Sequence, residues 1–241
     1  MRENIVILGK GRSASAFQKI CIKAGIRTKF LENDETGGSI IKDNDIIVQF
    51  NEGKCKECIS FMEVSTKVPK IWLSEIYGIS ITEWSSQFKH PEKVVGFCFG
   101  NFFPENPFVE LIEGERTKVD ILNKSIDLFT FLGFSVTKQK DRPGYILNRV
   151  VVSMINEAIF IYDYGLAQME DIDQMMRLGA NFPMGPFEYA DYLGLDRVLK
   201  TLEWLTEELG PQYRPCPLLR RKVEAGMLGK KTGKGFYEYG I

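Results

Sequence analysis

Histidine is nearly absent from this chain of 241 residues, in which His90 is the only one. Imidazole is the commonest metal ligand and exchanges protons readily near neutral pH, so a single copy leaves little material for a metal centre. The five cysteines are an odd number, and only Cys55 and Cys58 form a C-x-x-C pair, with no second pair at zinc spacing. We therefore expect no metal site and no disulfide framework.

Net charge and long apolar runs are also missing. The formal net charge is −1, which argues against a surface built to neutralise nucleic acid. No apolar run approaches the roughly 18 residues of a membrane-spanning helix, and the first residues show no apolar core of a secretion signal. With 44% hydrophobic and 26% charged residues, the composition is that of an ordinary globular protein. We predict a cytoplasmic protein that binds neither nucleic acid nor membranes.

The first 140 residues alternate short apolar runs with helical patterns. Such alternation predicts an α/β fold in which a parallel, doubly wound sheet of the Rossmann type carries helices on its faces. The expected strands are 4–8, 27–31, 45–50, 70–73, 94–99 and 134–138, and the expected helices are 13–24, 54–64 and 118–131.

A turn-forming run, Asp141–Gly144, ends this alternation. Beyond it, Leu147, Val151 and Met154 begin a broad apolar band at helical spacing, which predicts a helix central to a helical domain or to a subunit interface. We predict two domains, a shortened dinucleotide-binding domain at 1–140 and an all-helical domain for substrate and dimerisation at 141–241.

A glycine-rich turn follows the first predicted strand. Gly9 permits a tight turn, Gly11 lets the backbone approach a pyrophosphate, and the small Ala14 allows close packing of helix on strand. The N–H groups at the start of the following helix can bind phosphate. Glu32 closes the second predicted strand, where a carboxylate accepts hydrogen bonds from a ribose 2′-hydroxyl and repels a 2′-phosphate. The pattern predicts NAD, in preference to NADP, as the cofactor.

Five blocks after residue 140 resemble the C-terminal domain of the 3-hydroxyacyl-CoA dehydrogenases. They read DRPGYILNRV, NEAIFIYDYG, DIDQMMRLG, FPMGPFEYADYLGLD and LGKKTGKGFYEY, in that order. The resemblance implies a helical domain of the 6-phosphogluconate dehydrogenase C-terminal-like type, which pairs two subunits into a homodimer. It also implies NAD-dependent hydride transfer at C3 of an acyl-CoA or a related 3-hydroxy acid.

The resemblance also assigns positions to the reaction centre. Glu110 falls on the family's glutamate and Asn148 on its asparagine, while Cys98 takes the place of the family's histidine and Tyr77 that of its serine. Gln49 stands where the family has a glutamate after the third strand. Only about a dozen residues follow Glu32 before that strand, so the helical arm with which the family holds the CoA is missing.

A thiol at position 98 is a poor substitute for imidazole. Its ordinary pKa is about 8.5, and it lacks the second nitrogen that links substrate oxygen to glutamate. His90 lies in a loop eight residues upstream, where we expect it to face solvent. Tyr77 is either an alternative proton donor or a side chain that fills the pocket. Two functions remain open: a dehydrogenase with altered or weak activity, or an inactive relative that binds nucleotide or acts as a dimeric interaction protein.

The glycine- and lysine-rich blocks near the C-terminus look chemically suggestive. We nevertheless expect the segments 182–188 and 229–237 to be architectural, because their glycines and prolines punctuate helices. Their lysines are expected to face solvent rather than to bind phosphate.

Overall fold

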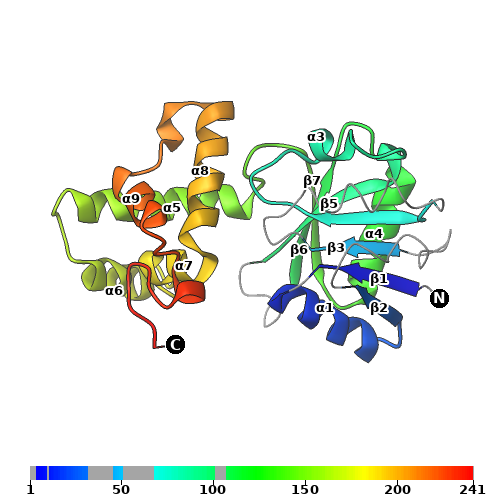
Figure 1. Ribbon diagram of the computed structural model, residues 1–241, viewed down its shortest axis with the longest axis horizontal. Helices are drawn as coiled ribbons and strands as arrows, with labels where there is room; N and C mark the ends of the chain where they lie inside the picture. The colour runs from blue at the N-terminus through cyan, green and yellow to red at the C-terminus, as the bar shows by residue number, and fades with distance from the viewer. Residues whose placement is uncertain (1–3, 10, 32–45, 51–67, 101–106, 241) are drawn as a thin grey trace. The chain divides into compact units, whose positions relative to one another are not determined.

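The computed structural model describes residues 4–9, 11–31, 46–50, 68–100 and 107–240. The chain divides into two compact units, Met1–Arg142 and Pro143–Ile241 (Figure 1). The division falls two residues after the boundary expected from the sequence. Cys55, Cys58, Glu32 and the predicted helix 54–64 lie outside the described residues.

The first unit is built on a seven-stranded sheet with the order β2-β1-β3-β4-β5-β6-β7. The first five strands run parallel, β6 is antiparallel to β5, and β7 is parallel to β6. The strands are β1 (Asn4–Leu8), β2 (Arg27–Leu31), β3 (Ile46–Gln49), β4 (Ile71–Glu75), β5 (Val94–Phe99), β6 (Phe108–Glu113) and β7 (Ser135–Lys140). The predicted α/β class is confirmed.

The prediction of a wholly parallel sheet is wrong at one end. Strand β6 was not expected, and it follows β5 after residues 100–107 alone. A parallel neighbour needs a crossover of a dozen or more residues, so this short connection requires β6 to turn back. The helix α4 (Val119–Phe131) then supplies the crossover that makes β7 parallel to β6.

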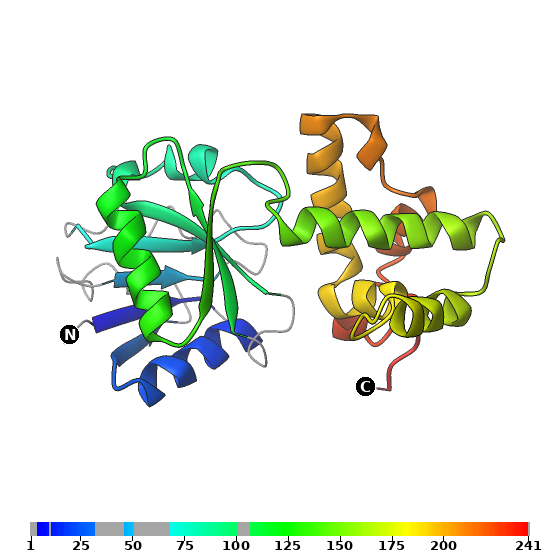
Figure 2. The same cartoon turned by 180° about the vertical axis from the view of Figure 1, so that it is seen from behind.

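The helices α1 (Arg12–Lys23) and α4 pack on the sheet (Figure 2). Aromatic rings fill the core between these helices and the sheet. Phe17 of α1 lies with its ring centroid 5.7 Å from that of Phe50, 6.0 Å from Phe99 and 5.9 Å from Phe129 of α4. All four side chains are buried. Burying a large aromatic ring stabilises the fold by roughly 1.5–3 kcal/mol, so this cluster holds both helices to the sheet.

Asp141, the last residue but one of the first unit, caps the short helix α3 (Ile81–Ser85). Its carboxylate accepts hydrogen bonds from the Ser80 hydroxyl at 2.5 Å and from the backbone N–H groups of Ile81 and Thr82 at 3.2 and 2.9 Å. A helix start leaves such N–H groups without internal partners, so a carboxylate there stabilises it.

The second unit is wholly helical in its described residues apart from isolated bridges. Its helices are α5 (Leu147–Asp163), α6 (Met169–Gly179), α7 (Pro186–Leu193), α8 (Leu195–Leu209) and α9 (Pro217–Glu224). Three short 3₁₀ turns are η2 (Pro91–Lys93) in the first unit and η3 (Pro211–Tyr213) and η4 (Lys230–Thr232) in the second. The central helix α5 packs on α7 and α8 (Figure 1). In the described part of the chain, every helix is too short or too polar to cross a membrane.

The role of Gly9 in the turn after β1 can be tested by substitution. A Cβ on Gly9, whose φ is +107°, would overlap the backbone carbonyl oxygen of Phe50. Gly25, with φ +77°, has open space around the same position. We expect Gly25→Ala to lower the free energy of unfolding by about 1 kcal/mol and Gly9→Ala by about 3 kcal/mol or more, because the second adds a backbone clash to the strain of positive φ. Urea unfolding measures both; equal losses would contradict the close packing of β1 on β3.

Candidate functional site

The glycine turn opens at the carboxyl edge of the parallel strands. Gly11 is the N-cap of α1 with φ +101°, and no side chain among the described residues caps this helix start. Backbone N–H groups at a helix start can bind an anion, and Ala14 in the first turn is fully buried. Strand β2 lies on one side of β1 and β3 lies on the other, so the strand order reverses beside β1, and nucleotides bind at such a reversal in these sheets. Gly9, Gly11 and Ala14 therefore fit a dinucleotide pyrophosphate.

Cys98 and Glu110 lie directly opposite each other on neighbouring strands. They are cross-strand partners in the antiparallel pair of β5 and β6, and each is 1% exposed. The Cys98 thiol contacts the backbone carbonyl oxygen of Phe99 at 3.6 Å, a weak interaction. The structure thus brings together the two positions that the resemblance paired. A buried thiol packs as a small, nearly apolar side chain.

Tyr77 has a partner that was not predicted from the sequence. Its hydroxyl donates a hydrogen bond of 2.7 Å to the carboxylate of Glu75, the last residue of β4. Glu75 is 4% exposed and Tyr77 is half-buried. The spacing in the sequence could have indicated this contact. Residues i and i+2 of an extended segment share a face, so a carboxylate two residues before a tyrosine at the end of a strand can reach the tyrosine hydroxyl.

Gln49 belongs to a buried polar cluster on one face of the sheet. Its side-chain oxygen accepts hydrogen bonds from the Trp72 indole N–H at 2.8 Å and the Ser74 hydroxyl at 3.3 Å. Ser74 in turn accepts one from the Trp84 indole N–H at 2.9 Å. The Gln49 oxygen is therefore engaged inside the fold, which gives this residue a structural role.

Asn148 lies in the second unit, in the first turn of α5, and is 4% exposed. The chain enters α5 through Gly144 at φ +77° and Tyr145 at φ +55°, an uncommon conformation for a tyrosine. The Tyr145 ring is buried against Trp204, with centroids 5.7 Å apart, which holds this turn in place. His90, by contrast, is exposed as predicted and pairs with Glu92 at 3.2 Å.

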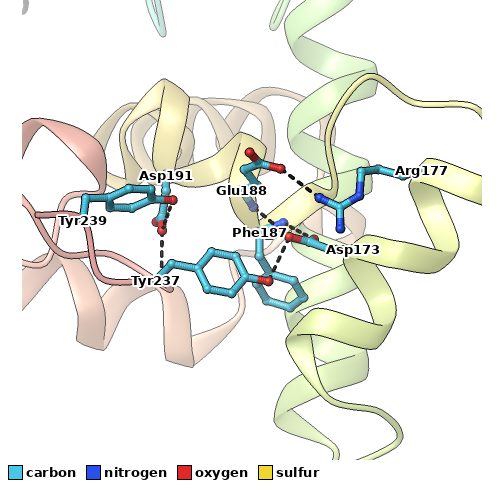
Figure 3. A network of polar contacts seen from close by, with 7 residues as sticks. All are labelled: Asp173, Arg177, Phe187, Glu188, Asp191, Tyr237 and Tyr239. Atoms are coloured by element: carbon cyan, nitrogen blue, oxygen red, sulfur yellow. Dashed lines mark hydrogen bonds and ion pairs between the residues drawn. The ribbon is translucent and has the colours of Figure 1, made fainter.

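The C-terminal blocks form a network around two buried aspartates (Figure 3). Asp173 accepts hydrogen bonds from the backbone N–H groups of Phe187 and Glu188, at 2.8 and 3.1 Å, and from the Tyr237 hydroxyl at 2.9 Å. Burial raises the pKa of Asp173, and burial together with the Asp173 carboxylate raises the pKa of Tyr237 above its ordinary value. Tyr237 therefore stays protonated, and it donates at any ordinary pH.

Asp191 plays the same part on the other side of this network (Figure 3). It accepts hydrogen bonds from the N–H groups of Phe236 and Tyr237, both at 2.8 Å, and from the Tyr239 hydroxyl at 3.1 Å. A Cβ at Gly235 would overlap this carboxylate. The glycine-rich blocks are thus required for close approach to a buried carboxylate, which confirms the architectural interpretation.

The lysines of the last block are exposed, as expected. Lys231 pairs with Asp196 at 2.6 Å, Lys234 pairs with Glu238, and Lys230 lies over the rings of Tyr192 and Tyr239. These contacts explain their presence without an anionic ligand.

The two units also match two family models. Residues 51–142 match the NAD binding domain of the 3-hydroxyacyl-CoA dehydrogenases, and residues 144–239 match the C-terminal domain of the same enzymes. The fold and the glycine turn define an NAD-binding domain followed by a helical domain. Because the two models cover well over half of the chain, the chain belongs to the 3-hydroxyacyl-CoA dehydrogenase family.

Individual proteins that are similar to this chain carry names from the same family. The 3-hydroxybutyryl-CoA dehydrogenase of Bradyrhizobium diazoefficiens is 43% identical over 174 residues, which cover 72% of this chain and 59% of that protein. That of Clostridioides difficile is 36% identical over 203 residues, 83% of this chain and 72% of the relative. The crystal structure of (S)-3-hydroxybutyryl-CoA dehydrogenase from Ralstonia eutropha superposes with a TM-score of 0.85 at 27% identity, covering all of both chains. The match to the Bradyrhizobium diazoefficiens enzyme spans about three fifths of that enzyme's length.

Removing one buried aspartate should test the network. We expect Asp191→Ala to lower the free energy of unfolding of the protein by about 3 kcal/mol or more, because three donors lose their acceptor inside the fold. Asp196→Ala is the matched control: its exposed pair with Lys231 should contribute less than about 1 kcal/mol. Chemical denaturation measures both. A loss at Asp191 no larger than at Asp196 would refute the role given to the carboxylate.

Proposed function

We propose that this protein is an NAD-dependent oxidoreductase that transfers hydride at C3 of a 3-hydroxyacyl-CoA or a related 3-hydroxy acid, with altered proton transfer. The observation that carries the proposal is the open glycine turn at the N-terminus of α1, at the carboxyl edge of a parallel sheet. Family membership supports the substrate class, since relatives named 3-hydroxybutyryl-CoA dehydrogenase match most of the chain.

The roles of the two units follow from the same proposal. The first unit would hold the cofactor with Gly9, Gly11 and Ala14, and Glu32 would select NAD by accepting hydrogen bonds from the ribose. By the same resemblance, Asn148 would keep the role of the family's asparagine. NAD supplies the hydride acceptor, so the protein has to orient the two reactants and to move one proton.

The altered step is proton transfer. In the family a histidine backed by a glutamate performs it, and here the corresponding pair is Cys98 and Glu110, both buried. Loss of a positioned acid–base group slows a reaction by about a hundred- to ten-thousand-fold. We therefore propose turnover well below that of relatives that keep the histidine, unless another group moves the proton.

We also propose that the protein forms a homodimer through its helical unit. Support comes from large apolar side chains left exposed there, among them Met175 and Leu178 on α6, which are 70% and 77% exposed. They stand three residues apart and therefore share one face of the helix. Such a face is stabilised when a second copy covers it.

Oxidation of NADH with acetoacetyl-CoA tests the function, and a thermal shift with NADH tests cofactor binding separately. We expect a raised melting temperature and measurable but slow turnover. Absence of turnover would refute the proposal, and cofactor binding without turnover would favour the inactive, nucleotide-binding relative. Cys98→His should raise the rate about a hundred-fold by returning an imidazole opposite Glu110. Cys21→His, at a buried cysteine of α1, is the control that should give no gain.

The dimer is tested by light scattering after size exclusion. We expect a mass near twice the 27.5 kDa of the chain for the unmodified protein. The double change Met175→Glu and Leu178→Glu should give the monomer, because it places charge on the apolar face. Ile22→Glu, at an exposed apolar residue of α1, is the control that should remain a dimer. A monomeric unmodified protein would overturn this proposal.

A further inference from the structure

Resting on the function proposed above, we propose that Glu75 and Tyr77 form a proton relay that replaces the lost imidazole. The Tyr77 hydroxyl would exchange a proton with the C3 oxygen of the substrate, and the Glu75 carboxylate would exchange one with Tyr77. The observation that carries this is the 2.7 Å hydrogen bond from the phenol to the buried carboxylate at the end of β4.

The position of the pair supports this role. Strands β1 to β5 all run parallel, so the end of β4 lies at the same edge of the sheet as the glycine turn after β1. Alternation along β4 places Glu75 on the same face as Leu73, which belongs to the core beneath α1. The pair therefore lies at the cofactor edge, on the side of the sheet from which α1 presents its N–H groups.

The pair is distinct from Cys98 and Glu110. The Ile76 side chain lies against Gly96 of β5, on the face of the sheet opposite to Glu75. Cys98, two residues after Gly96 on β5, belongs to the same face as Gly96. Glu75 and Tyr77, which flank Ile76, leave the strand on the other side. The two carboxylates thus do not share one proton, and the relay does not depend on the thiol.

The proton and electron balance of the relay is complete. In oxidation of the alcohol, the C3–H bond breaks and its hydride passes to the oxidised nicotinamide ring. The hydroxyl proton passes to the Tyr77 oxygen while the Tyr77 proton passes to a Glu75 oxygen, which later releases it to water. In reduction each transfer is reversed, so Glu75 must then be protonated.

Two uncharged residues on the neighbouring strands lie beside this end of β4. Phe97 of β5 is the register partner of Glu75, and Gln49 of β3 is the register partner of Ser74, the residue before Glu75. The relay predicts that oxidation slows as pH falls and Glu75 takes up a proton, because a protonated carboxyl cannot accept the proton of the phenol.

The test uses the full-length chain and two conservative variants. Tyr77→Phe keeps the ring and should lower turnover about a hundred-fold or more, with an unchanged thermal shift by NADH. Glu75→Gln should also slow oxidation and should remove the acidic limb of its pH–rate profile. Tyr192→Phe, at a half-buried tyrosine of the helical unit, is the matched control and should keep the rate and the profile.

A second readout needs neither cofactor nor turnover. With isotope-labelled tyrosine, the ring-carbon NMR resonance that is lost in Tyr77→Phe should move in Glu75→Gln, because the phenol loses its charged acceptor. An unmoved resonance would overturn the relay. Full rates and an unchanged pH profile in both variants would also overturn it while leaving the proposed function standing. An unmodified protein that does not turn over would refute both.

Discussion

The antiparallel pairing of β6 with β5 is the constraint on which the first unit depends. The connection between these strands is too short for a crossover, so the chain reverses and sets Glu110 opposite Cys98. The same reversal allows α4 to return the chain to β7 and to press Phe129 into the aromatic core. One backbone register therefore determines both the packing of the sheet and the neighbours of Cys98.

The second unit is held together by two buried carboxylates that lie beside its buried aromatic rings. Asp173 and Asp191 are buried, and each accepts two backbone N–H groups and at least one phenol. Buried carboxylates are tolerated when several donors surround them, and the resulting geometry requires glycine wherever the backbone comes close. The glycine-rich blocks therefore serve the fold.

Much of the fold could be predicted from the sequence because local patterns determine it. The limits of β1, β2 and β5 agree with the predicted strands, although only β1 and β5 are short apolar runs and β2 begins with Arg27, Thr28 and Lys29. Strand β6 could not be predicted, because Phe108–Glu113 read as the end of an aromatic segment and its direction depends on a loop length. In the candidate site, Cys98 and Glu110 were paired by resemblance alone, whereas the contact of Tyr77 with Glu75 required the three-dimensional path of the chain.

The capping of α3 by Asp141 limits where the first unit can be cut from the second. Asp141 stands beside the division, yet its carboxylate holds the start of a helix that begins four residues after Tyr77. The segment carrying the phenol is thus anchored at one end by β4 and at the other by this acid. A fragment that stopped at residue 140 would keep every strand of the sheet and still lose one of those anchors, so an excised nucleotide domain has to extend through Asp141 to be faithful to the intact protein.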